Sequence, residues 1–380
     1  MGLGTLDVRP FRLLHPSPGR AQRRHETAGW QARGRDLVTA PALYLVTLTT
    51  GTKSIRAIAI SLMVGDSLRS AGLLPHEAVH PPAVNRRLKS LRAARVDREP
   101  VLLTHPGGGL AVAAAARDPQ PLLYLTYADL TVEVARIGEA DAEIVMADLG
   151  RRSCLVADGH HRLAAAMAHR AQCVARRQAQ ESQRRQDEPT GQDLLLDAPD
   201  NDCGLVTALV VDSDDTPLTI NPIHRVLHRR GPQPLQLDEV VAALRATQPS
   251  LQSTSVHPDQ AEPSPSGVVL SRSSELVVRD RAASTTLWCP PVPAAGLPTS
   301  AHVVEAAAAG LPGTTMRRLR ESDRVLAATQ RRGTVAVLFQ ALTHNEIFDA
   351  ISHGDLLPVK ATSFEPKLPA GVLIRPIDHC

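Results

Sequence analysis

Aromatic residues are scarce in this 380-residue chain, in which two Trp, three Tyr and four Phe make up 2% of the sequence. Proteins that bind single-stranded nucleic acid need aromatic side chains on which bases stack, so this scarcity argues against that class. A large excess of charge of one sign is also lacking, because 42 basic and 39 acidic side chains leave a formal net charge of +3. Such a balance indicates no general affinity for nucleic acids or anionic membranes.

Paired cysteines and long apolar runs are absent as well. The five cysteines form no C-x-x-C pair, which argues against a disulfide framework and a thiolate zinc site. The longest apolar stretches, such as 57–60 and 110–116, are far shorter than the ~20 residues of a membrane helix. Arg9, Arg12 and several prolines interrupt the region where a secretion signal would be apolar. We therefore expect a cytoplasmic protein without a membrane partner.

The length of the chain suggests two or three domains. Residues 1–177 alternate between strand-like and helix-like segments, which predicts a first α+β domain. Residues 178–203 are rich in Gln, Arg and Asp, and they indicate a solvated helix end followed by a polar linker. We expect residues 204–380 to form a second α+β region that completes a ligand pocket.

Hydrophobic patterns predict most of the individual elements. Strands are expected at 43–49, 55–64, 101–104, 153–157, 204–211, 268–271, 275–279, 285–289 and 334–340. Helices are expected at 85–96, 160–177, 301–309, 316–330 and 345–352. Residues 110–117 and 122–127 suggest a hairpin, whereas 140–147 fits a helix or a strand.

The segment 155–167 carries the clearest chemistry. A strand leads to Asp158, Gly159 allows a tight and left-handed turn, and a helix follows that buries Leu163 and Met167. The first turn of such a helix presents backbone N–H groups and the positive end of the helix dipole. The turn is therefore a candidate site for an anionic ligand.

Three side chains in this turn suit phosphate chemistry. Arg162 can donate a bidentate fork to a phosphate or carboxylate, and His161 can bond a phosphoryl oxygen or move a proton near neutral pH. Asp158 can cap the helix, bind Mg²⁺ or accept a proton from a hydroxyl group. The simpler alternative is an ordinary turn and helix cap beside two surface histidines.

A second motif, at residues 76–80, matches the zinc-protease pattern H-E-x-x-H. That pattern requires a helix, but Pro81 directly follows His80 and disfavours helical backbone angles there. We therefore predict no metalloprotease site. Glu77 remains a candidate general base or metal ligand in a loop, with a solvated surface charge as the alternative. The helix expected after it is strongly basic and contains Arg86 and Arg87.

Lysine is rare, because the chain has only four among its 42 basic residues. Two of them, Lys360 and Lys367, lie within eight residues, which suggests that a compact ammonium group is preferred there, as in many phosphate sites. Chance clustering is the alternative. His224 and Arg225 follow a predicted strand and turn, and are weaker candidates for the same pocket. No G-x-x-x-x-G-K-[ST], G-x-G-x-x-G or G-x-S-x-G motif is present.

These motifs resemble the bacterial family catalogued as domain of unknown function 1015. Its A-D-G-H-H-R hallmark matches residues 157–162 in full, and further matches follow its order: Pro75-His76-Glu77, Arg87-Leu88, Pro222-Ile223-His224-Arg225 and the segment 360–367. The chain departs from the family pattern at Arg86, Ile223 and Ala361. It also lacks the family's P-P-Y-D element before residue 70.

The D-G-H-H-R turn is also similar to the phosphate-binding motif of the ParB/sulfiredoxin-like superfamily, which includes nucleotide-dependent kinases of free serine. This resemblance implies an α+β fold with a ParB/sulfiredoxin-like core of mixed sheet and helices. It implies ATP or ADP with Mg²⁺ as cofactor, and phosphoryl transfer to a small hydroxyl metabolite. The implied catalytic residues are Asp158, which would also bind the metal, His161 and Glu77. The implied phosphate-binding residues are Gly159, His160, Arg162, Arg87, His224, Arg225, Lys360 and Lys367.

Two other function classes remain open at this point. The first is a regulatory or binding protein that responds to a nucleotide without turning it over. The second is a DNA-associated protein that uses the basic residues of 86–95 and 176–185, against which the near-neutral total charge argues.

Overall fold

The computed structural model describes residues 4–15, 37–187, 202–254, 274–289, 300–352 and 356–377. The chain forms two compact units. Unit 1 consists of Met1–Pro75, Val79–Leu218 and Pro366–Cys380, and unit 2 consists of His76–Ala78 and Thr219–Glu365. Each unit combines sheets with helices, so the fold class is α+β, as the sequence predicts.

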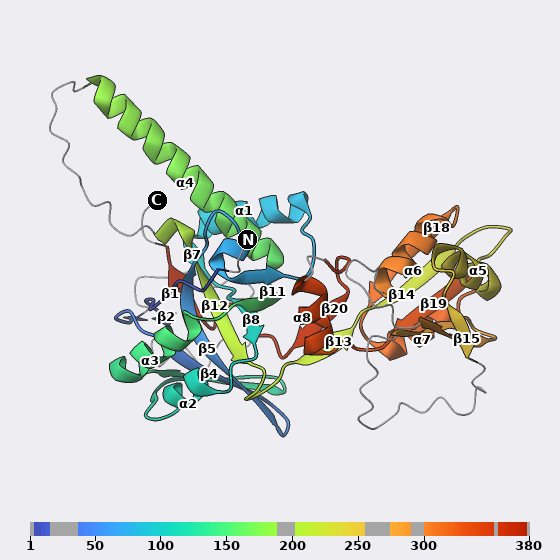
Figure 1. Ribbon diagram of the computed structural model, residues 1–380, viewed down its shortest axis with the longest axis horizontal. Coiled ribbons are helices and arrows are strands. Elements are labelled where there is room, and N and C mark those ends of the chain that lie inside the picture. Colours follow the sequence, from blue (N-terminus) through green and yellow to red (C-terminus); the bar gives the residue numbers. More distant parts are fainter. Residues whose placement is uncertain are drawn as a thin grey trace. The chain divides into compact units, whose positions relative to one another are not determined.

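Unit 1 is built on a nine-stranded mixed sheet (Figure 1). Two strand pairs are parallel, β11 with β6 and β12 with β8, and the other pairs are antiparallel. The strands follow the order β6 (Leu73–Pro75), β11 (Cys154–Asp158), β8 (Val101–His105), β12 (Leu205–Asp212), β5 (Lys53–Met63), β4 (Tyr44–Thr50), β10 (Leu130–Arg136) and β9 (Gln120–Tyr127), with β1 (Val8–Arg9) also on β5.

Two short strand pairs complete unit 1. β2 (Leu14–His15) pairs with β3 (Leu37–Val38), and β7 (Val96–Asp97) pairs with β21 (Arg375–Pro376). The second pair brings the C-terminal segment beside residues 96–97. The backbone N–H of Gly371 also donates to the carbonyl of Arg98 at 2.9 Å, so the segment after residue 366 is tied to this part of unit 1.

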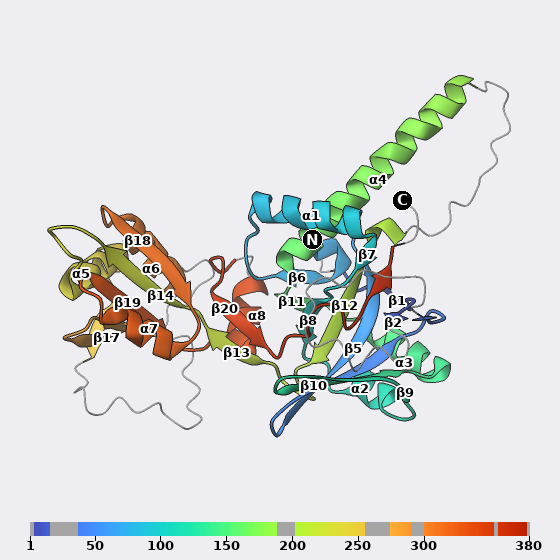
Figure 2. The same cartoon turned by 180° about the vertical axis from the view of Figure 1, so that it is seen from behind.

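Helices cover both faces of this sheet (Figures 1 and 2). α1 (Pro81–Ala94) and α4 (His160–Asp187) pack together on one face, and α2 (Leu110–Ala115) and α3 (Glu139–Leu149) pack together on the other. The central strand β5 is therefore buried along most of its length, which explains its nearly continuous apolar run. No described helix combines the length and the apolar composition that a bilayer crossing requires.

The two helices nearest the D-G-H-H-R turn differ from their predicted bounds. α1 begins at Pro81 rather than at residue 85, because proline fits the first positions of a helix, where no backbone N–H is needed. His80 is extended, with φ −94° and ψ 121°, as the following proline requires. Residues 76–80, which match the H-E-x-x-H pattern, therefore do not form a helix. α4 continues to Asp187, so the first ten residues of the expected linker are helical.

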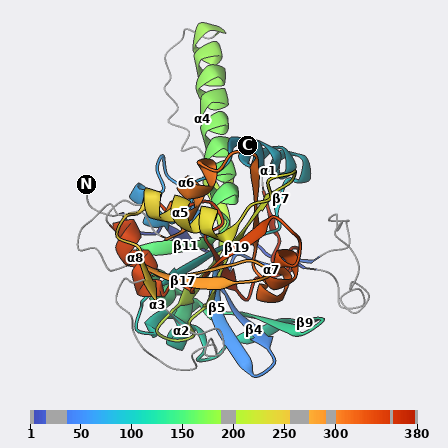
Figure 3. The same cartoon turned by 90° about the vertical axis from the view of Figure 1, so that its right-hand side faces the viewer.

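Unit 2 contains a six-stranded sheet in the order β15 (Gln252–Thr254), β17 (Ser284–Cys289), β16 (Ser274–Arg279), β19 (Thr334–Phe339), β14 (His224–Arg229) and β18 (Thr314–Leu319). α5 (Leu237–Thr247) and α6 (Ser300–Ala309) lie side by side over one face (Figure 3), where they share a core with Leu227. α7 (Ser322–Thr329) packs with Val226, on the opposite face. β13 (Thr219–Pro222) comes before this sheet in the chain and β20 (Thr362–Glu365) comes after it, and the two strands pair with each other. α8 (His344–Ser352) completes the unit.

Several expectations for individual elements are wrong. Residues 110–115 form α2 instead of a strand, so β9 pairs with β10 rather than with that segment. Residues 314–319 form β18, and only the second half of the helix expected at 316–330 is helical. The ambiguous segment at 140–147 lies in a helix. The strand expected at 268–271 lies outside the described residues.

Two further differences concern the chain as a whole. β12, expected to open the second region, pairs with β5 and β8 in the main sheet of unit 1. Cys203, just before it, is disulfide-bonded, whereas the scattered spacing of the cysteines indicated no disulfide framework. Cys154 and Cys173 are free and buried.

Candidate functional site

The turn before α4 depends on a glycine. Gly159 has φ +106°, a region that other residues rarely adopt. A Cβ atom there would lie 2.8 Å from Cγ1 of Val101 and 3.1 Å from the guanidinium of Arg162. Only glycine therefore allows β11 to turn directly into α4 while β8 stays close to the turn.

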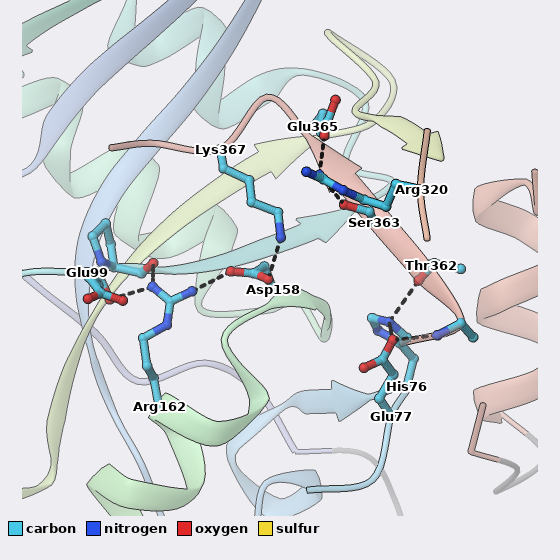
Figure 4. Close-up of polar contacts among 12 residues, drawn as sticks. His76, Glu77, Glu99, Asp158, Arg162, Arg320, Thr362, Ser363, Glu365 and Lys367 are labelled. Carbon is cyan, nitrogen blue, oxygen red and sulfur yellow. Dashed lines mark hydrogen bonds and ion pairs between the residues drawn. The ribbon is translucent and has the colours of Figure 1, made fainter. Parts of the chain in front are cut away.

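Asp158, at the end of β11, lies between two cations (Figure 4). Its Oδ1 accepts a hydrogen bond from Nζ of Lys367 at 2.8 Å, and its Oδ2 accepts one from Nη2 of Arg162 at 2.5 Å. The side chains of Asp158 and Lys367 are 34% and 44% exposed, whereas that of Arg162 is 18% exposed. The three groups form a cluster, here called the Asp158 cluster, that solvent and a ligand can reach.

Opposing effects act on the pKa of Asp158. Burial raises this pKa, but the positive charge of Arg162 and the hydrogen bond and charge of Lys367 outweigh burial, so the pKa lies below its ordinary value. The group is therefore a carboxylate at neutral pH and a weak proton acceptor. It is better suited to orienting cations than to acting as a general base.

Arg162 also holds the segment before β8. Its Nη1 donates to the carbonyl oxygens of Glu99 at 2.7 Å and Pro100 at 2.5 Å. The expectation that its fork is presented to a ligand therefore needs correction, since both terminal nitrogens already have protein acceptors. The backbone N–H of Arg162 is engaged too, because it donates to the carbonyl of Gly159 at 2.8 Å.

The two histidines of the turn have different surroundings. His160 is buried, at 7% exposure. Nε2 of His161 accepts a hydrogen bond from the backbone N–H of His80 at 3.1 Å, and the two imidazole rings stack with centroids 6.2 Å apart. A nitrogen that accepts this bond carries no proton. His161 thus ties the residue before α1 to the first turn of α4.

A cavity lies beside the Asp158 cluster within unit 1, bounded by α1, α4, the segment 96–99 and the start of β12. Its volume is about 60 Å³, and Arg162 lines both the cavity and the cluster. The other lining residues are Arg87, Ser90, Leu91, Ala94, Val96, Asp97, Arg98, Glu99, Ala165, Ala166, Leu205 and Val206. Its walls are mostly small and apolar, while three guanidinium groups and two carboxylates supply charge.

Glu77 belongs to unit 2. Its Oε1 accepts a hydrogen bond from the backbone N–H of Ala361 at 3.1 Å and lies 3.6 Å from Nε2 of His76 (Figure 4). His76 is 1% exposed and shares a hydrogen bond of 3.1 Å with the hydroxyl of Thr362. Residues 76–77 are therefore fastened to the segment around β20 by both side chains.

The other candidates of unit 2 are mostly buried. Arg225 is 0% exposed, and it donates to Glu305 at 2.8 Å and to the carbonyls of Ile223 at 2.6 Å and Lys360 at 3.2 Å. His224 is 3% exposed and accepts from the backbone N–H of Phe339. Burial and the charge of Arg225 lower the pKa of His224. The expectation that these two residues present donors to phosphate needs correction, because their contacts are internal.

Lys360 differs from its buried neighbours. Its side chain is exposed, and its backbone has φ +56°, which is uncommon for a residue with a side chain. The carbonyl oxygen of Lys360 accepts the hydrogen bond from Arg225, so the unusual backbone is fixed by a buried donor.

The predicted site residues thus fall into two groups. Unit 1 brings together Asp158, Gly159, His160, His161, Arg162, Arg87 and Lys367, and unit 2 holds Glu77, His224, Arg225 and Lys360. Sequence reasoning missed Glu99, which accepts from Arg87 at 2.9 Å, and Asp97 in the cavity. Their only signal was an acidic pair directly after a basic helix and directly before a strand.

Asp158 is the predicted Mg²⁺ ligand, and its two oxygens accept hydrogen bonds from Lys367 and Arg162. Within the described residues, no three His, Cys, Asp or Glu side chains converge as a metal-binding group. Mg²⁺ at nucleotide sites commonly takes one or two carboxylates and completes its coordination with phosphate oxygens and water. A single carboxylate among cations is therefore compatible with a metal that arrives with its nucleotide.

Comparisons with known proteins agree with the resemblance described above. The family model "Protein of unknown function (DUF1015)" matches residues 24–299, so it ends before the segment 360–367. No curated protein matches the chain.

Among solved structures, SbnI with a C-terminal truncation from Staphylococcus aureus is similar at 14% identity and a TM-score of 0.45, covering 83% of this chain and 87% of that one. A free serine kinase in complex with AMP is similar at 15% identity and a TM-score of 0.41, covering 86% and 94%. A conserved hypothetical protein from Pyrococcus furiosus is similar at 12% identity and a TM-score of 0.39, covering 80% and 92%.

Proposed function

This chain belongs to the family described as Protein of unknown function (DUF1015), and we propose that it binds a nucleotide at the Asp158 cluster and transfers a phosphoryl group to a small hydroxyl metabolite. The observation that carries the proposal is the Asp158 cluster itself. Two cations from segments far apart in sequence meet one carboxylate at the start of a helix. Phosphate sites are built from such charges, because phosphoryl transfer requires positioning and charge neutralisation more than covalent catalysis.

The cavity supports the same proposal. It starts at Arg162 and continues between α1 and α4 along a mostly apolar wall. A nucleotide is an amphipathic ligand with a charged end and a flat apolar end, and known ligand sites combine an apolar lining with a few polar groups. Phosphates at the Asp158 cluster would therefore place the nucleoside at the mouth of this cavity.

The residues of unit 1 suit distinct steps of the transfer. Lys367 would bind the phosphate oxygens, and Arg162, whose terminal nitrogens bond protein acceptors, would contribute its positive charge without a direct contact. Asp158 would hold Mg²⁺ as it arrives with the nucleotide. The acceptor hydroxyl oxygen attacks the transferred phosphorus, and the bond from that phosphorus to the bridging oxygen of the nucleotide breaks. Nε2 of His161, which carries no proton, would take the hydroxyl proton once it releases the backbone N–H of His80.

The direct test combines binding and turnover. We expect ADP and ATP with Mg²⁺ to raise the melting temperature, since a ligand that prefers the folded state stabilises it. Asp158→Asn and Lys367→Gln should each abolish most of this shift. Lys360→Gln is the matched control, because it removes an exposed lysine of unit 2 and should leave the shift unchanged. A wild-type protein that responds to neither nucleotide contradicts the proposal.

A second candidate function is nucleotide binding without turnover. Two observations favour it. Nε2 of His161 already accepts the backbone N–H of His80, and Asp158, whose pKa is lowered between two cations, is a poor general base. Transfer of the terminal phosphoryl group of labelled ATP or ADP to free serine separates the candidates. Labelled phosphoserine that disappears in His161→Ala supports the kinase, whereas tight binding with no labelled product supports the binding protein.

A further inference from the structure

Asp97 is a buried carboxylate in the cavity wall that the steps above do not use. It lies at the end of β7 and is 8% exposed. Its Oδ2 accepts a hydrogen bond from the backbone N–H of Thr207 at 2.7 Å, which ties β7 to β12. The described part of the chain supplies no hydrogen-bond donor to its Oδ1. One oxygen is therefore fixed by the fold and the other is available to a ligand in the cavity.

The size of the cavity limits what can approach this oxygen. The volume of about 60 Å³ is several times the ~10–15 Å³ that holds one water molecule, but less than half of the ~150 Å³ that encloses a benzene ring. A base cannot enter as a whole. One edge of it can, while the rest of the ring and the sugar stay at the mouth.

The walls around Asp97 decide which edge is favourable. Ala94, Ala165 and Ala166 offer no donor to a ligand group that reaches the interior, so the side-chain donors of this cavity are its three guanidinium groups and the hydroxyl of Ser90. A buried carboxylate oxygen without a donor is costly, and a hydrogen bond to a charged group is among the stronger ones in proteins. A carbonyl oxygen placed against Oδ1 of Asp97 would face a second hydrogen-bond acceptor. An amino group would satisfy the carboxylate.

We propose that Asp97 is a specificity-determining residue that selects nucleotides whose base carries an exocyclic amino group, with that group bonded to its Oδ1. This inference rests on the nucleotide-binding function proposed above. It assigns the amino bases adenine, cytosine and guanine, the last through its 2-amino group, as the ligand class, and it rejects hypoxanthine and uracil, the oxo counterparts of adenine and cytosine. Arg87, Arg98 and Arg162, at the same cavity, restrict the ligand further to one that carries anionic groups.

The first test needs only the wild-type chain and two matched pairs of nucleotides. Binding of ATP is compared with ITP, and CTP with UTP, by isothermal titration calorimetry at constant salt. The amino member of the tighter pair should bind at least about tenfold more tightly than its oxo member, as expected for a hydrogen bond to a charged acceptor. Equal affinities within the tighter pair would overturn the inference without the need for any variant.

The second test changes one atom of the protein. Asp97→Asn keeps an oxygen for the Thr207 N–H and turns an amide NH₂ group towards the cavity, so the fold should survive. The new amide NH₂ group favours a carbonyl oxygen on the base. The preference for ATP over ITP, or for CTP over UTP, should therefore fall by at least about tenfold or reverse. Asp141→Asn is the matched control, since it makes the same change in a carboxylate that bonds Arg117 outside the cavity, and it should leave the preference unchanged.

The outcomes separate this inference from the proposed function. If no nucleotide binds the wild-type chain, the proposed function fails, and this inference fails with it. If nucleotides bind and Asp158→Asn weakens all of them equally, but Asp97→Asn leaves the base preference as it was, only the role of Asp97 is refuted. A preference that shifts in Asp141→Asn as much as in Asp97→Asn also refutes it.

Discussion

Asp158 in unit 1 and Arg225 in unit 2 are both charged residues of a family motif, and both are paired with opposite charges, yet their environments differ. Asp158 is 34% exposed and its partner Lys367 is 44% exposed. Arg225 is 0% exposed, and its hydrogen bonds go to Glu305 and to two backbone carbonyls. The same residue types thus form an accessible cluster in one unit and an internal brace in the other.

This difference separates binding from structure on physical grounds. Exposed ion pairs contribute about 0–1 kcal/mol to stability, so a charged ligand can rearrange them at small cost. Breaking a buried pair leaves an uncompensated charge away from water and costs about 3–5 kcal/mol. Motif residues of the first kind are candidates for ligand contact, whereas those of the second kind maintain the fold.

The largest expected effect tests the buried member of this comparison. Arg225→Met should lower the free energy of unfolding by about 3–5 kcal/mol, because Glu305 loses its buried partner and two buried carbonyls lose their donor. Urea denaturation measures it. Arg318→Met is the control: Arg318 also bonds Glu305 but is 31% exposed, so the loss should stay within about 1 kcal/mol. Equal losses in both variants would remove the distinction between buried and exposed pairs.

A smaller effect is expected at the turn that shapes the Asp158 cluster. Gly159→Ala combines a left-handed backbone with a close contact to Val101, and should cost about 1–3 kcal/mol of unfolding free energy and most of the nucleotide affinity. Gly108→Ala shares the left-handed backbone but meets nothing within 4 Å, so it should cost less. Thermal unfolding checks both, and an unaffected Gly159→Ala would show that the turn is not constrained.

The pH dependence of Asp158 is a more subtle test of the accessible cluster. Because its pKa in the folded chain lies below the ordinary value, its pairing stabilises the fold above the unfolded-state pKa of about 3.9 and is lost as pH falls through the folded pKa. The wild-type melting temperature should therefore exceed that of Asp158→Asn at pH 7, and the gap should close below about pH 4. A gap that is constant from pH 7 to pH 3 would contradict the ionic pairing.

The smallest effect on stability should accompany a large effect on binding. Lys367→Gln removes a half-exposed partner of Asp158 and should cost less than about 1 kcal/mol of unfolding free energy. The same change should weaken nucleotide binding at least about tenfold, since a point charge near phosphate is lost. Urea denaturation and calorimetric titration of ADP on the same preparation give both values. A stability loss comparable to that of Arg225→Met would place Lys367 with the structural residues.

The local hydrophobic pattern predicted secondary structure correctly where it fitted only one kind of element. The runs at 43–49 and 55–64 are the hairpin of β4 and β5, and the turn at Asp158 lies between a strand and a helix, as expected. The prediction for 110–117 failed because an alanine- and valine-rich run fits a buried helix as well as a strand. At 316–330 the prediction failed in the first half, because the exposed arginines of strand β18 have the polar pattern expected of a solvent-facing helix.

The sequence by itself determined the local part of the Asp158 cluster. It supplies Gly159 where the backbone must be left-handed, and it places Asp158 and Arg162 four positions apart across the turn. Only the tertiary structure decided that β12 inserts between β5 and β8, that Asp97 enters a cavity, and that Arg225 is enclosed while Lys367 reaches Asp158. The physical reason is that conformational preference depends on neighbours in sequence. Burial and pairing depend on segments that lie more than a hundred residues apart.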